Sequence, residues 1–568
     1  MPSRLLPATA AVIVMLAATA CTAASRHQPA GTPTTKPPSG SPSASQGTSA
    51  AGPVPSASAT PSAAPPGPAS AGGAITKGLV PLPVAAQTDP AATFTLDAGT
   101  QIAVEPGTGA VAVGNDLAAL LRPATGYPLP VHSVHSSESP GDAVVLRLAA
   151  AEPALGDEGY DLTVTTKHIV IAARQPAGLF YGVQTLRQLL PASIEATAQQ
   201  PGPWQVVGGR IVDHPRFSYR GAMLDVARHF FTVAEVERYI DELALYKVNV
   251  LHLHLSDDQG WRLAIDGWPR LATHGGSTEV GGGPGGFYTK DQYRAIVRYA
   301  QDRFITVVPE IDTPSHATAA LSSYPQLTCT GVAPPLATAA NATSTALCTS
   351  KATVYAFLDD VVGELAALTP GPYIDLGGDE AQAVSAVAYK AYIEKAQAIV
   401  AAHGKKLMGW ADIAQAQLHS SSVAEYWNFK DKGATMRAAV SQGVKVVAAP
   451  ANHAYLDQKY DPNFPLGLDW AGDISVEAAY SWDPTDGGIA TDSDLLGVEA
   501  PLWSETVRSM ADAEYLAWPR MAGIAEVGWT PKAERAWTTY QPRLAQQAPR
   551  CAQLGIHFYR SPEVAWAA

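Results

Sequence analysis

Residues 372–380 read Pro-Tyr-Ile-Asp-Leu-Gly-Gly-Asp-Glu, a short apolar run that ends at two glycines and then presents two adjacent acids. Side chains along a regular strand point alternately to opposite faces, so Asp379 and Glu380 can address one ligand only where the strand has ended. Gly377 and Gly378 supply the backbone freedom for that turn. Two carboxyl groups at the end of a buried strand suit acid–base chemistry on a sugar, whereas a loop with two solvated acids is the alternative.

Apolar, strand-like runs recur on both sides of this segment from about residue 216 onward. They lie at Gly221–Val226, Asn249–Leu255, Ile305–Pro309, Tyr373–Leu376, Lys406–Gly409, Val423–Tyr426, Val444–Ala448 and Leu495–Ala500. Helical patterns fall between many of them, at Val233–Tyr246, Lys290–Asp302, Thr353–Ala367 and Ala381–His403. Eight strands that alternate with helices predict an α/β fold, a (β/α)8 TIM barrel over residues 211–568.

In such a barrel the residues that follow the strands gather on one face and form the active site. The residues in those positions are Asp225 and Arg228, Asp257 and Asp258, Glu310 and Asp312, Asp379 and Glu380, Trp410, Trp427, Asn452 and His453, and Trp503 with Glu505. Acids serve catalysis and hydroxyl recognition, and indole rings cover the apolar faces of sugar rings. The composition of this face therefore indicates a carbohydrate site.

A smaller α+β domain is expected ahead of the barrel, over residues 77–210. Strands are predicted at Ala143–Leu148, Tyr160–Val164 and His168–Ala172, and helices at Val111–Thr125 and Gly178–Leu190. Candidate catalytic residues are not concentrated in this segment, so we expect it to support the barrel.

The first 21 residues have the pattern of an export signal. Arg4 precedes an apolar stretch that ends in small residues just before Cys21. Cleavage before Cys21 by an ordinary signal peptidase fits. Lipoprotein processing, which leaves an acylated Cys21 at the new N-terminus, also fits and is favoured, although Ala18 stands where a lipobox usually has Leu. Residues 22–75 are almost wholly Ala, Ser, Thr, Pro and Gly, which predicts a disordered spacer. We therefore expect an exported protein, either extracellular or lipid-anchored to the outer face of the cell membrane.

The charge, the hydropathy and the cysteine content bear on possible partners, membrane spans and disulfide bonds. The net charge of −13 and the lack of a basic stretch argue against a nucleic-acid partner. Beyond the signal, no stretch has the apolar length of a membrane span. Cys329 and Cys348 flank an Ala/Pro/Thr-rich loop and are expected to form a disulfide, which would contribute about 3 kcal/mol. Cys551 would then stay free and buried.

The motifs of the barrel, taken together and in order, resemble those of glycoside hydrolase family 20, the β-N-acetylhexosaminidases. They are Arg220-Gly-Ala-Met-Leu-Asp-Val-Ala-Arg-His-Phe-Phe, His252-Leu-His-Leu-Ser-Asp-Asp-Gln-Gly-Trp-Arg, Val308-Pro-Glu-Ile-Asp-Thr-Pro-Ser-His, Gly377-Gly-Asp-Glu and Trp503-Ser-Glu. Residues 77–210 are similar to the small domain that precedes this barrel in the family. The chain departs at two positions, because many members have His where Asp375 stands and Gly where Ser315 stands. We expect Asp375 to support the catalytic pair from behind and to affect the acidity of Asp379.

The resemblance implies a retaining exo-β-N-acetylhexosaminidase that removes terminal non-reducing GlcNAc or GalNAc residues. The substrate's own 2-acetamido oxygen would be the nucleophile, and an oxazolinium ion the intermediate. Glu380 would act as general acid and then general base, with its proton affinity raised by a negative Asp379. Asp379 would orient the acetamido group and stabilise the positive charge. The partner would be an amino-sugar oligosaccharide, and no metal or organic cofactor is implied.

Further residues match the family's substrate pocket. Tyr455 matches the donor to the acetamido oxygen, and Asp312 would orient Asp379. The other matching positions are Trp410, Trp427 and Trp503, which would enclose the acetamido group and the ring; Arg228, Asp457 and Glu505, which would bind hydroxyls; and Asp257, His316 and Trp470.

Two other classes of function remain open from the sequence. His252 and His254 form a His-x-His pair at a strand end, as in metal-dependent amidohydrolases, but matching metal-binding histidines are not seen after the later strands. A non-catalytic envelope protein that captures amino sugars is the other alternative. The intact Asp379 and Glu380 argue against it.

Overall fold

The computed structural model describes residues 74–106, 109–135, 140–148, 153–341 and 345–567. The expected export signal, Cys21 and the spacer as far as residue 73 lie outside the described residues. The last two residues assigned to the spacer belong to a short 3-10 turn, Ala74–Thr76, in which Ile75 is buried. Within the described part of the chain, no helix has both the length and the apolar character needed to cross a membrane.

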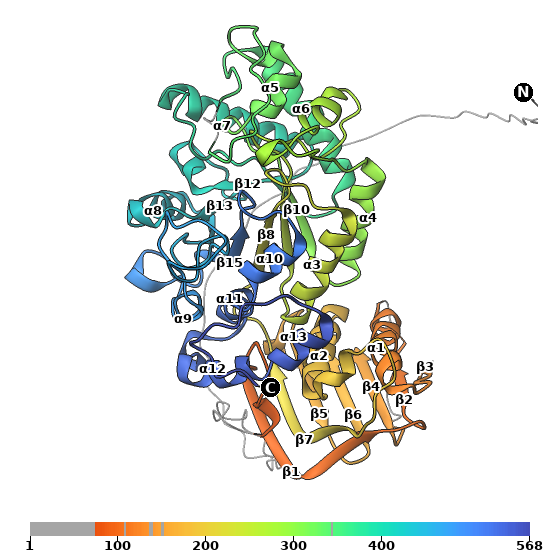
Figure 1. The fold of residues 1–568 in the computed structure, drawn as a ribbon. Coiled ribbons are helices and arrows are strands. Elements are labelled where there is room, and N and C mark those ends of the chain that lie inside the picture. The colour runs from red at the N-terminus through yellow and green to blue at the C-terminus, as the bar shows by residue number, and fades with distance from the viewer. Residues whose placement is uncertain (1–73, 107–108, 136–139, 149–152, 342–344, 568) are drawn as a thin grey trace, which may run out of the picture. The chain divides into compact units, whose positions relative to one another are not determined.

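Eight parallel strands close into a barrel, as the sequence predicts (Figure 1). They are β8 (Tyr219–Asp225), β9 (Val250–His254), β10 (Thr306–Glu310), β11 (Tyr373–Asp375), β12 (Lys406–Trp410), β13 (Val423–Tyr426), β14 (Lys445–Ala448) and β15 (Leu495–Leu502). Neighbours in sequence are neighbours in space, and β15 pairs with β8 to complete the ring. All eight predicted runs are strands, because a strand buried on both faces reads as a continuous apolar stretch.

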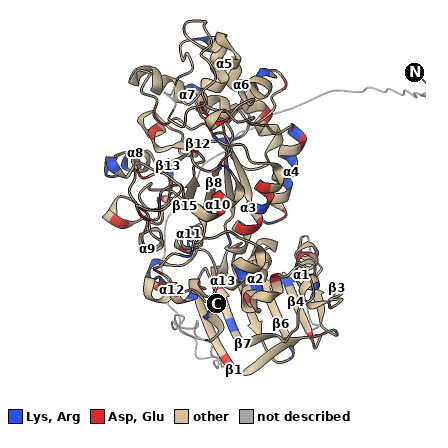
Figure 2. Cartoon of the chain, in the orientation of Figure 1, with Lys and Arg blue, Asp and Glu red and all other residues tan. Residues whose placement is uncertain are grey.

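Helices surround the barrel (Figure 1). They are α3 (Val233–Leu245), α4 (Lys290–Gln301), α5 (Thr318–Ser323), α6 (Ala352–Leu368), α7 (Ala386–Ala402), α8 (Ala434–Ser441), α9 (Val476–Tyr480), α10 (Met510–Ala517) and α11 (Arg520–Trp529). Helices α12 (Trp537–Ala545) and α13 (Ala548–Leu554) follow and lie beside the N-terminal domain, where α13 contacts residues 192–195. Capping boxes at Thr232 and Thr289 start α3 and α4. In Figure 2 the ribbon segments of acidic and basic residues are interspersed along outer helices such as α3 and α4.

Helix α7 begins five residues later than predicted. The sequence favours a helix from Ala381, but α7 starts at Ala386, where the Ser385 hydroxyl accepts a hydrogen bond from the Ala388 N–H. Glu380, at the end of the turn that follows β11, has a left-handed backbone with φ of 48°. Residues 381–385 are irregular, and α7 begins where Ser385 caps it.

The segment before the barrel forms a seven-stranded mixed sheet in the order β1-β7-β5-β6-β4-β2-β3. Its strands are β1 (Ala85–Leu96), β2 (Gln101–Val104), β3 (Val131–Ser133), β4 (Ala143–Leu148), β5 (Tyr160–Val164), β6 (His168–Ala173) and β7 (Trp204–Asp213). Helices α1 (Ala110–Thr125) and α2 (Pro176–Leu189) pack against the sheet. The three predicted strands and both predicted helices are present. The sequence analysis missed β1, β2, β3 and β7.

Asp213 at the end of β7 links this sheet to barrel residues. Its carboxylate accepts hydrogen bonds from Tyr160 Oη at 2.6 Å, Lys247 Nζ at 3.0 Å and Trp529 Nε1 at 2.9 Å. All four residues are buried. A buried ion pair needs such additional hydrogen bonds to offset the cost of removing its charges from water.

Candidate active site

The turn after β11 brings two consecutive carboxyl groups to one cavity. Gly377 and Gly378 have positive φ angles of 66° and 98°. A Cβ at Gly377 would lie 1.9 Å from Asp312 Oδ1, and one at Gly378 would lie 2.7 Å from a methyl carbon of Ile413. Both positions therefore require glycine, for backbone conformation and for space. The sequence interpretation of this turn is confirmed.

Asp379 and Glu380 line a cavity of about 530 Å³ at the carboxyl ends of the strands. The cavity is lined by Arg228, His316, Ala340, Asn341, Asp379, Glu380, Trp427, Asn428, Lys430, Tyr455, Asp457, Leu468, Trp470, Trp503 and Glu505. The structure thus gathers most of the predicted site residues around one space. The other three, Asp257, Asp312 and Trp410, are buried and do not line it.

A chain of charged groups crosses one wall of the cavity. Arg228 Nη2 lies 2.8 Å from Asp257 Oδ2, and His254 Nε2 lies 3.0 Å from the same oxygen. His316 connects Asp257 to the catalytic pair. Its Nδ1 is 3.5 Å from Asp257 Oδ1, and its Nε2 is 3.7 Å from Asp379 Oδ2 and 3.6 Å from Glu380 Oε2. Burial opposes a charge on His316, but attraction to Asp257 and Asp379 outweighs it and raises the pKa of His316 well above its usual range. We conclude that His316 is a cation at neutral pH.

The two catalytic candidates differ in acidity. Burial raises the pKa of Asp379 to about 7, with repulsion from Asp412 and Glu380 adding to this and attraction to His316 opposing it. The His316 cation, whose Nε2 lies 3.6 Å from Glu380 Oε2, lowers the pKa of Glu380, whose side chain is 50% exposed. The expectation that a charged Asp379 raises the proton affinity of Glu380 stays a prediction, because two neighbouring carboxylates repel each other while His316 acts in the opposite sense. With these shifts, Asp379 binds a proton more readily than Glu380.

The Asp312 side chain supports the turn by a hydrogen bond to the backbone of the turn. Its Oδ1 accepts a hydrogen bond from the Gly378 N–H at 3.2 Å. Burial, together with repulsion from Asp379, raises the pKa of Asp312 well above its usual range. The side chain therefore acts as a neutral acid that fixes the turn without adding a second buried negative charge.

Aromatic rings surround the rest of the cavity. Trp503 lies 5.5 Å from Trp410 between ring centroids, and Tyr455 lies 5.8 Å from Trp470. Trp470 is 40% exposed, whereas Trp410 is 1% exposed and donates its Nε1–H to Glu310 Oε1 at 2.9 Å. Trp410 thus packs beside Trp503 and does not face the open space directly.

Several buried polar atoms point to a ligand rich in hydrogen-bond donors. Within the described residues, Asp379 Oδ1, Asp457 Oδ1 and Glu505 Oε2 have no hydrogen-bond partner. Burial, then repulsion from Glu505, raises the pKa of Asp457 to about 8. Buried acceptors of this kind are costly unless a ligand satisfies them, and sugar hydroxyls or an amide N–H would do so.

The structure adds one acid to the site that the sequence analysis did not select. Asp412 accepts a hydrogen bond from Trp427 Nε1 at 3.0 Å and raises the pKa of Asp379 by repulsion. It follows strand β12 by two residues, so an acid just after a barrel strand was the available signal. Asp412 also lines a second cavity of about 340 Å³, which shares Glu380, Trp427 and Asn428 with the first.

Two other sets of predicted residues lie outside the main cavity. Asn452 and His453 line a separate cavity of about 180 Å³ beside Trp482. Cys329 and Cys348 are joined by a disulfide, and Cys551 is free and buried.

Comparison with known proteins agrees with this geometry. Residues 217–390 and 384–532 match the catalytic domain of glycosyl hydrolase family 20, and residues 76–214 match domain 2 of the same family. This chain belongs to glycosyl hydrolase family 20. It is a glycoside hydrolase, a β-N-acetylhexosaminidase, and it acts on amino-sugar substrates.

Relatives of family 20 cover nearly the same length as this chain. A β-N-acetylhexosaminidase of Cellulomonas fimi is 40% identical over 491 residues, which are 86% of this chain and 97% of that protein. The solved family 20 β-N-acetylhexosaminidase of Streptomyces coelicolor A3(2) is 50% identical, with a TM-score of 0.83 over 87% of this chain and 99% of that chain. The Streptomyces plicatus N-acetyl-β-hexosaminidase, solved with Thio-NAglucal, is 49% identical with a TM-score of 0.83, over 87% of this chain and 98% of that chain.

The family assignment replaces the amidohydrolase alternative. His252 Nδ1 lies 2.9 Å from Glu499 Oε1, and His254 Nε2 lies 3.0 Å from Asp257 Oδ2. Both histidines thus contact carboxylates of the barrel core and the site wall.

The acidity of the catalytic pair predicts how activity falls at alkaline pH, on the alkaline limb of the pH–rate profile. The pair keeps a proton below the pKa of Asp379, about 7, and loses it as the pH rises further. We expect kcat/KM on a nitrophenyl N-acetylglucosaminide to fall about tenfold per pH unit above that value, because the general acid has then lost its proton. His316→Gln removes the neighbouring cation and should move this limb to higher pH. A profile that stays flat to pH 9 would show that this proton is not used.

Proposed function

We propose that this enzyme is a retaining, exo-acting β-N-acetylhexosaminidase in which the acetamido oxygen of the substrate is the nucleophile. One observation supports this above the others: Asp379 and Glu380 are adjacent carboxyls in one cavity, yet their environments differ sharply. Glu380 is half-exposed at the edge of the cavity, while the Asp379 side chain is 15% exposed and its buried Oδ1 has no hydrogen-bond partner among the described residues. One carboxyl is suited to exchange protons with a leaving group and water, and the other to hold an amide.

The proposed first step joins the acetamido oxygen to the anomeric carbon as the bond from that carbon to the leaving oxygen breaks. Glu380 donates its proton to the leaving oxygen, and an oxazolinium ion forms. Asp379 accepts a hydrogen bond from the acetamido N–H and balances the positive charge. Tyr455 is suited to donate to the acetamido oxygen, because burial raises its pKa well above the usual range and keeps the phenol protonated.

In the second step water attacks the anomeric carbon, Glu380 takes a proton from that water, and the bond to the acetamido oxygen breaks. Two displacements at one carbon return the original configuration, so the product keeps the anomeric configuration of the substrate. The reaction needs the proton on Glu380 and the charge on Asp379, whereas the directions of their pKa shifts favour the proton on Asp379. We propose that substrate binding causes the exchange, because the acetamido N–H favours a charged Asp379 and His316 lies within 4 Å of both carboxyls.

Exo action is the second part of the proposal. Arg228, Asp457 and Glu505 lie in the wall of the cavity; Arg228 and Asp457 are buried and Glu505 is partly buried. Their polar groups are suited to the hydroxyls of a terminal sugar. The Arg228 guanidinium also lies 4.8 Å from the Trp503 ring centre, which fixes its direction. We propose that this wall ends the sugar-binding site after one terminal residue.

Asp379→Asn and Glu380→Gln test these roles. Each is expected to lower turnover of a nitrophenyl N-acetylglucosaminide by about two to four orders of magnitude, because each removes a charge or proton that the reaction needs. Thermal unfolding midpoints should stay close to that of the unmodified enzyme. Glu394→Gln, at an exposed acid on α7, is the matched control and should leave turnover unchanged. Full activity of either catalytic variant would contradict the assignment.

We further propose that the enzyme is exported and anchored through an acylated Cys21. The apolar segment before Cys21 and the Ser/Pro/Ala/Thr-rich stretch that follows support this. Expressed with its native signal in a bacterial host, the enzyme should sediment with membranes and incorporate labelled palmitate. Cys21→Ser should release it and abolish the label. Recovery of the unmodified enzyme in the medium, without label, would favour ordinary cleavage before Cys21.

A further inference from the structure

One layer of the barrel interior is made almost entirely of acids. His252, Asp375, Glu425 and Glu499 lie on β9, β11, β13 and β15, which are alternate strands of the barrel. Four side chains from alternate strands form one layer in this fold, and such layers are usually filled with branched apolar residues. We call these four residues the acid layer. The neighbouring cluster of core residues is apolar: Tyr219, Val250, Val308, Met408, Val423 and Val447.

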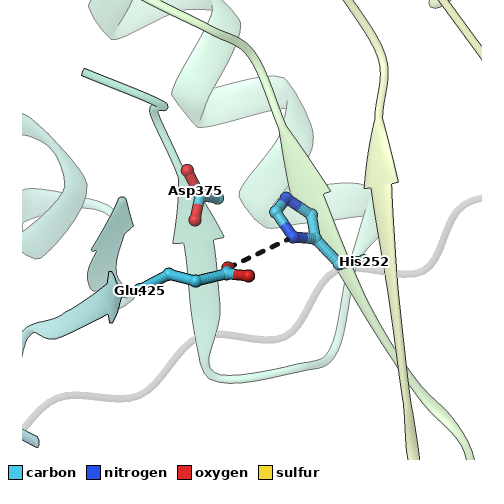
Figure 3. Close-up of side chains that lie close together, drawn as sticks. All are labelled: His252, Asp375 and Glu425. Atoms are coloured by element: carbon cyan, nitrogen blue, oxygen red, sulfur yellow. Dashed lines mark ion pairs between the residues drawn. The ribbon is translucent and has the colours of Figure 1, made fainter. Parts of the chain in front are cut away.

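The acid layer is completely buried and its members contact one another. All four residues are 0% exposed. His252 Nδ1 lies 2.9 Å from Glu499 Oε1 and 3.7 Å from Glu425 Oε2. Figure 3 shows the Glu425 side chain reaching between Asp375 and His252, with its ion-pair contact to the imidazole. Tyr219 Oη donates to Glu499 Oε2 at 2.5 Å from an adjacent strand.

The acid layer contains more negative groups than positive ones. Glu310 lies next to it, with Oε2 3.1 Å from His252 Nε2 and 2.5 Å from His254 Nδ1. Four carboxyls, those of Glu310 and of the layer, therefore face two imidazoles. Among the ion pairs of the described residues, none joins these carboxyls to a lysine or an arginine. Full ionisation would leave two uncompensated charges in the core, which is prohibitively costly.

Asp375 connects this layer to the catalytic turn. Its Oδ1 accepts a hydrogen bond from the Gly377 N–H at 2.7 Å, two residues before Asp379. Its Oδ2 is buried without a hydrogen-bond partner in the described part of the chain. Burial, with repulsion from Glu310 and Glu499 and against attraction to His252, raises the pKa of Asp375 well above its usual range. Burial and Glu499 have the same effect on Glu425.

Two protons or one divalent cation could supply the missing positive charge. Ligand atoms of His252, Asp375 and Glu425 lie within 4.8 Å of one another, which is close enough to surround an ion. However, both ring nitrogens of His252 face carboxylate oxygens, at 2.9 Å and 3.1 Å. The Nδ1 hydrogen bond to Glu499 and the ion pair of Nε2 with Glu310 favour the imidazolium form of His252, which carries a proton on each nitrogen and has no lone pair for a metal. Protons therefore fit the geometry better.

We propose that Asp375 is a positioning residue that holds the catalytic turn as a neutral, protonated acid, with Glu425 carrying the second proton of the acid layer. Asp375 Oδ1 holds the Gly377 N–H, while a proton on Oδ2 removes a negative charge from the barrel interior close to the catalytic turn. The expected effects on turnover rest on the proposed function. The number of protons that the acid layer binds in the folded state does not depend on it.

The first test compares two substitutions at position 375. Asp375→Asn has the shape of the protonated acid and keeps an oxygen for the Gly377 N–H, so kcat should stay within about threefold of the unmodified enzyme. Asp375→Leu has similar size but leaves that N–H unsatisfied. It should lower kcat at least about tenfold with little change in KM, because the catalytic carboxyls are displaced while the sugar-binding wall is intact. Equal, large losses in both variants would show that an ionised carboxylate is required and would overturn the proposal.

The second test is independent of activity and follows thermal unfolding between pH 5 and pH 8. The folded pKa of Asp375 is raised, so above the unfolded value of about 4 the native state holds a proton that unfolding releases. Its contribution to stability is present at low pH and decreases as the pH rises. Asn cannot titrate, so the midpoint of Asp375→Asn should rise relative to the unmodified enzyme with increasing pH. Release of one proton on unfolding changes the ratio of the unfolding equilibrium constants of the two proteins by about tenfold per pH unit.

Glu425→Gln is the matched control. It belongs to the same layer but does not touch the turn, so it should show the same pH-dependent gain in stability with unchanged kcat. A midpoint difference that does not vary with pH in either variant would refute the protonated state. Stoichiometric divalent metal in the purified enzyme, measured by mass spectrometry, would refute it too. If the acetamido mechanism alone is wrong, the stability result would still be obtained.

Discussion

Two buried acids hold the backbone of the catalytic turn, and the rest of the site depends on this clamp. Asp375 accepts the N–H of Gly377, and Asp312 accepts the N–H of Gly378. A side chain at either glycine would collide with its surroundings. The turn therefore has one conformation, in which Asp379 and Glu380 address the same cavity. The fold positions the chemistry through backbone hydrogen bonds rather than through the catalytic side chains themselves.

A high density of acids around this turn creates an electrostatic problem that the structure solves in two ways. Arg228 and His316 supply positive charge on the cavity wall, where Asp257 is ionised between them. Deeper in the barrel, the described ion pairs of Glu310 and Glu499 are made with His252 and His254, and burial raises the pKa values of Asp312 and Asp375 well above their usual range. In this environment the pKa of Asp379 is about 7, so small changes on substrate binding can charge its carboxyl group.

Much of this could be predicted from the sequence, and the failures have physical causes. The barrel strands are buried on both faces and read as apolar runs, and the two glycines mark the catalytic turn. Strand β1 was missed because it is half-exposed, rich in Ala and Thr and contains a proline. The acidities of Asp379 and Glu380 could not be ranked from the sequence, because they depend on His316, which follows another strand and contacts both carboxyls. The role of Trp410 in the pocket stays a prediction; its indole lies buried beside Trp503.

The central claim is that the substrate's amide attacks its own anomeric carbon. The most direct test compares kcat/KM for nitrophenyl N-acetylglucosaminide and its N-trifluoroacetyl analogue, which have the same leaving group. Fluorine withdraws electrons from the amide oxygen, so the account predicts a fall of about two orders of magnitude or more, or roughly 3 kcal/mol in the barrier. Equal values for the two substrates would contradict it, because the amide would then take no part in the rate-determining chemistry.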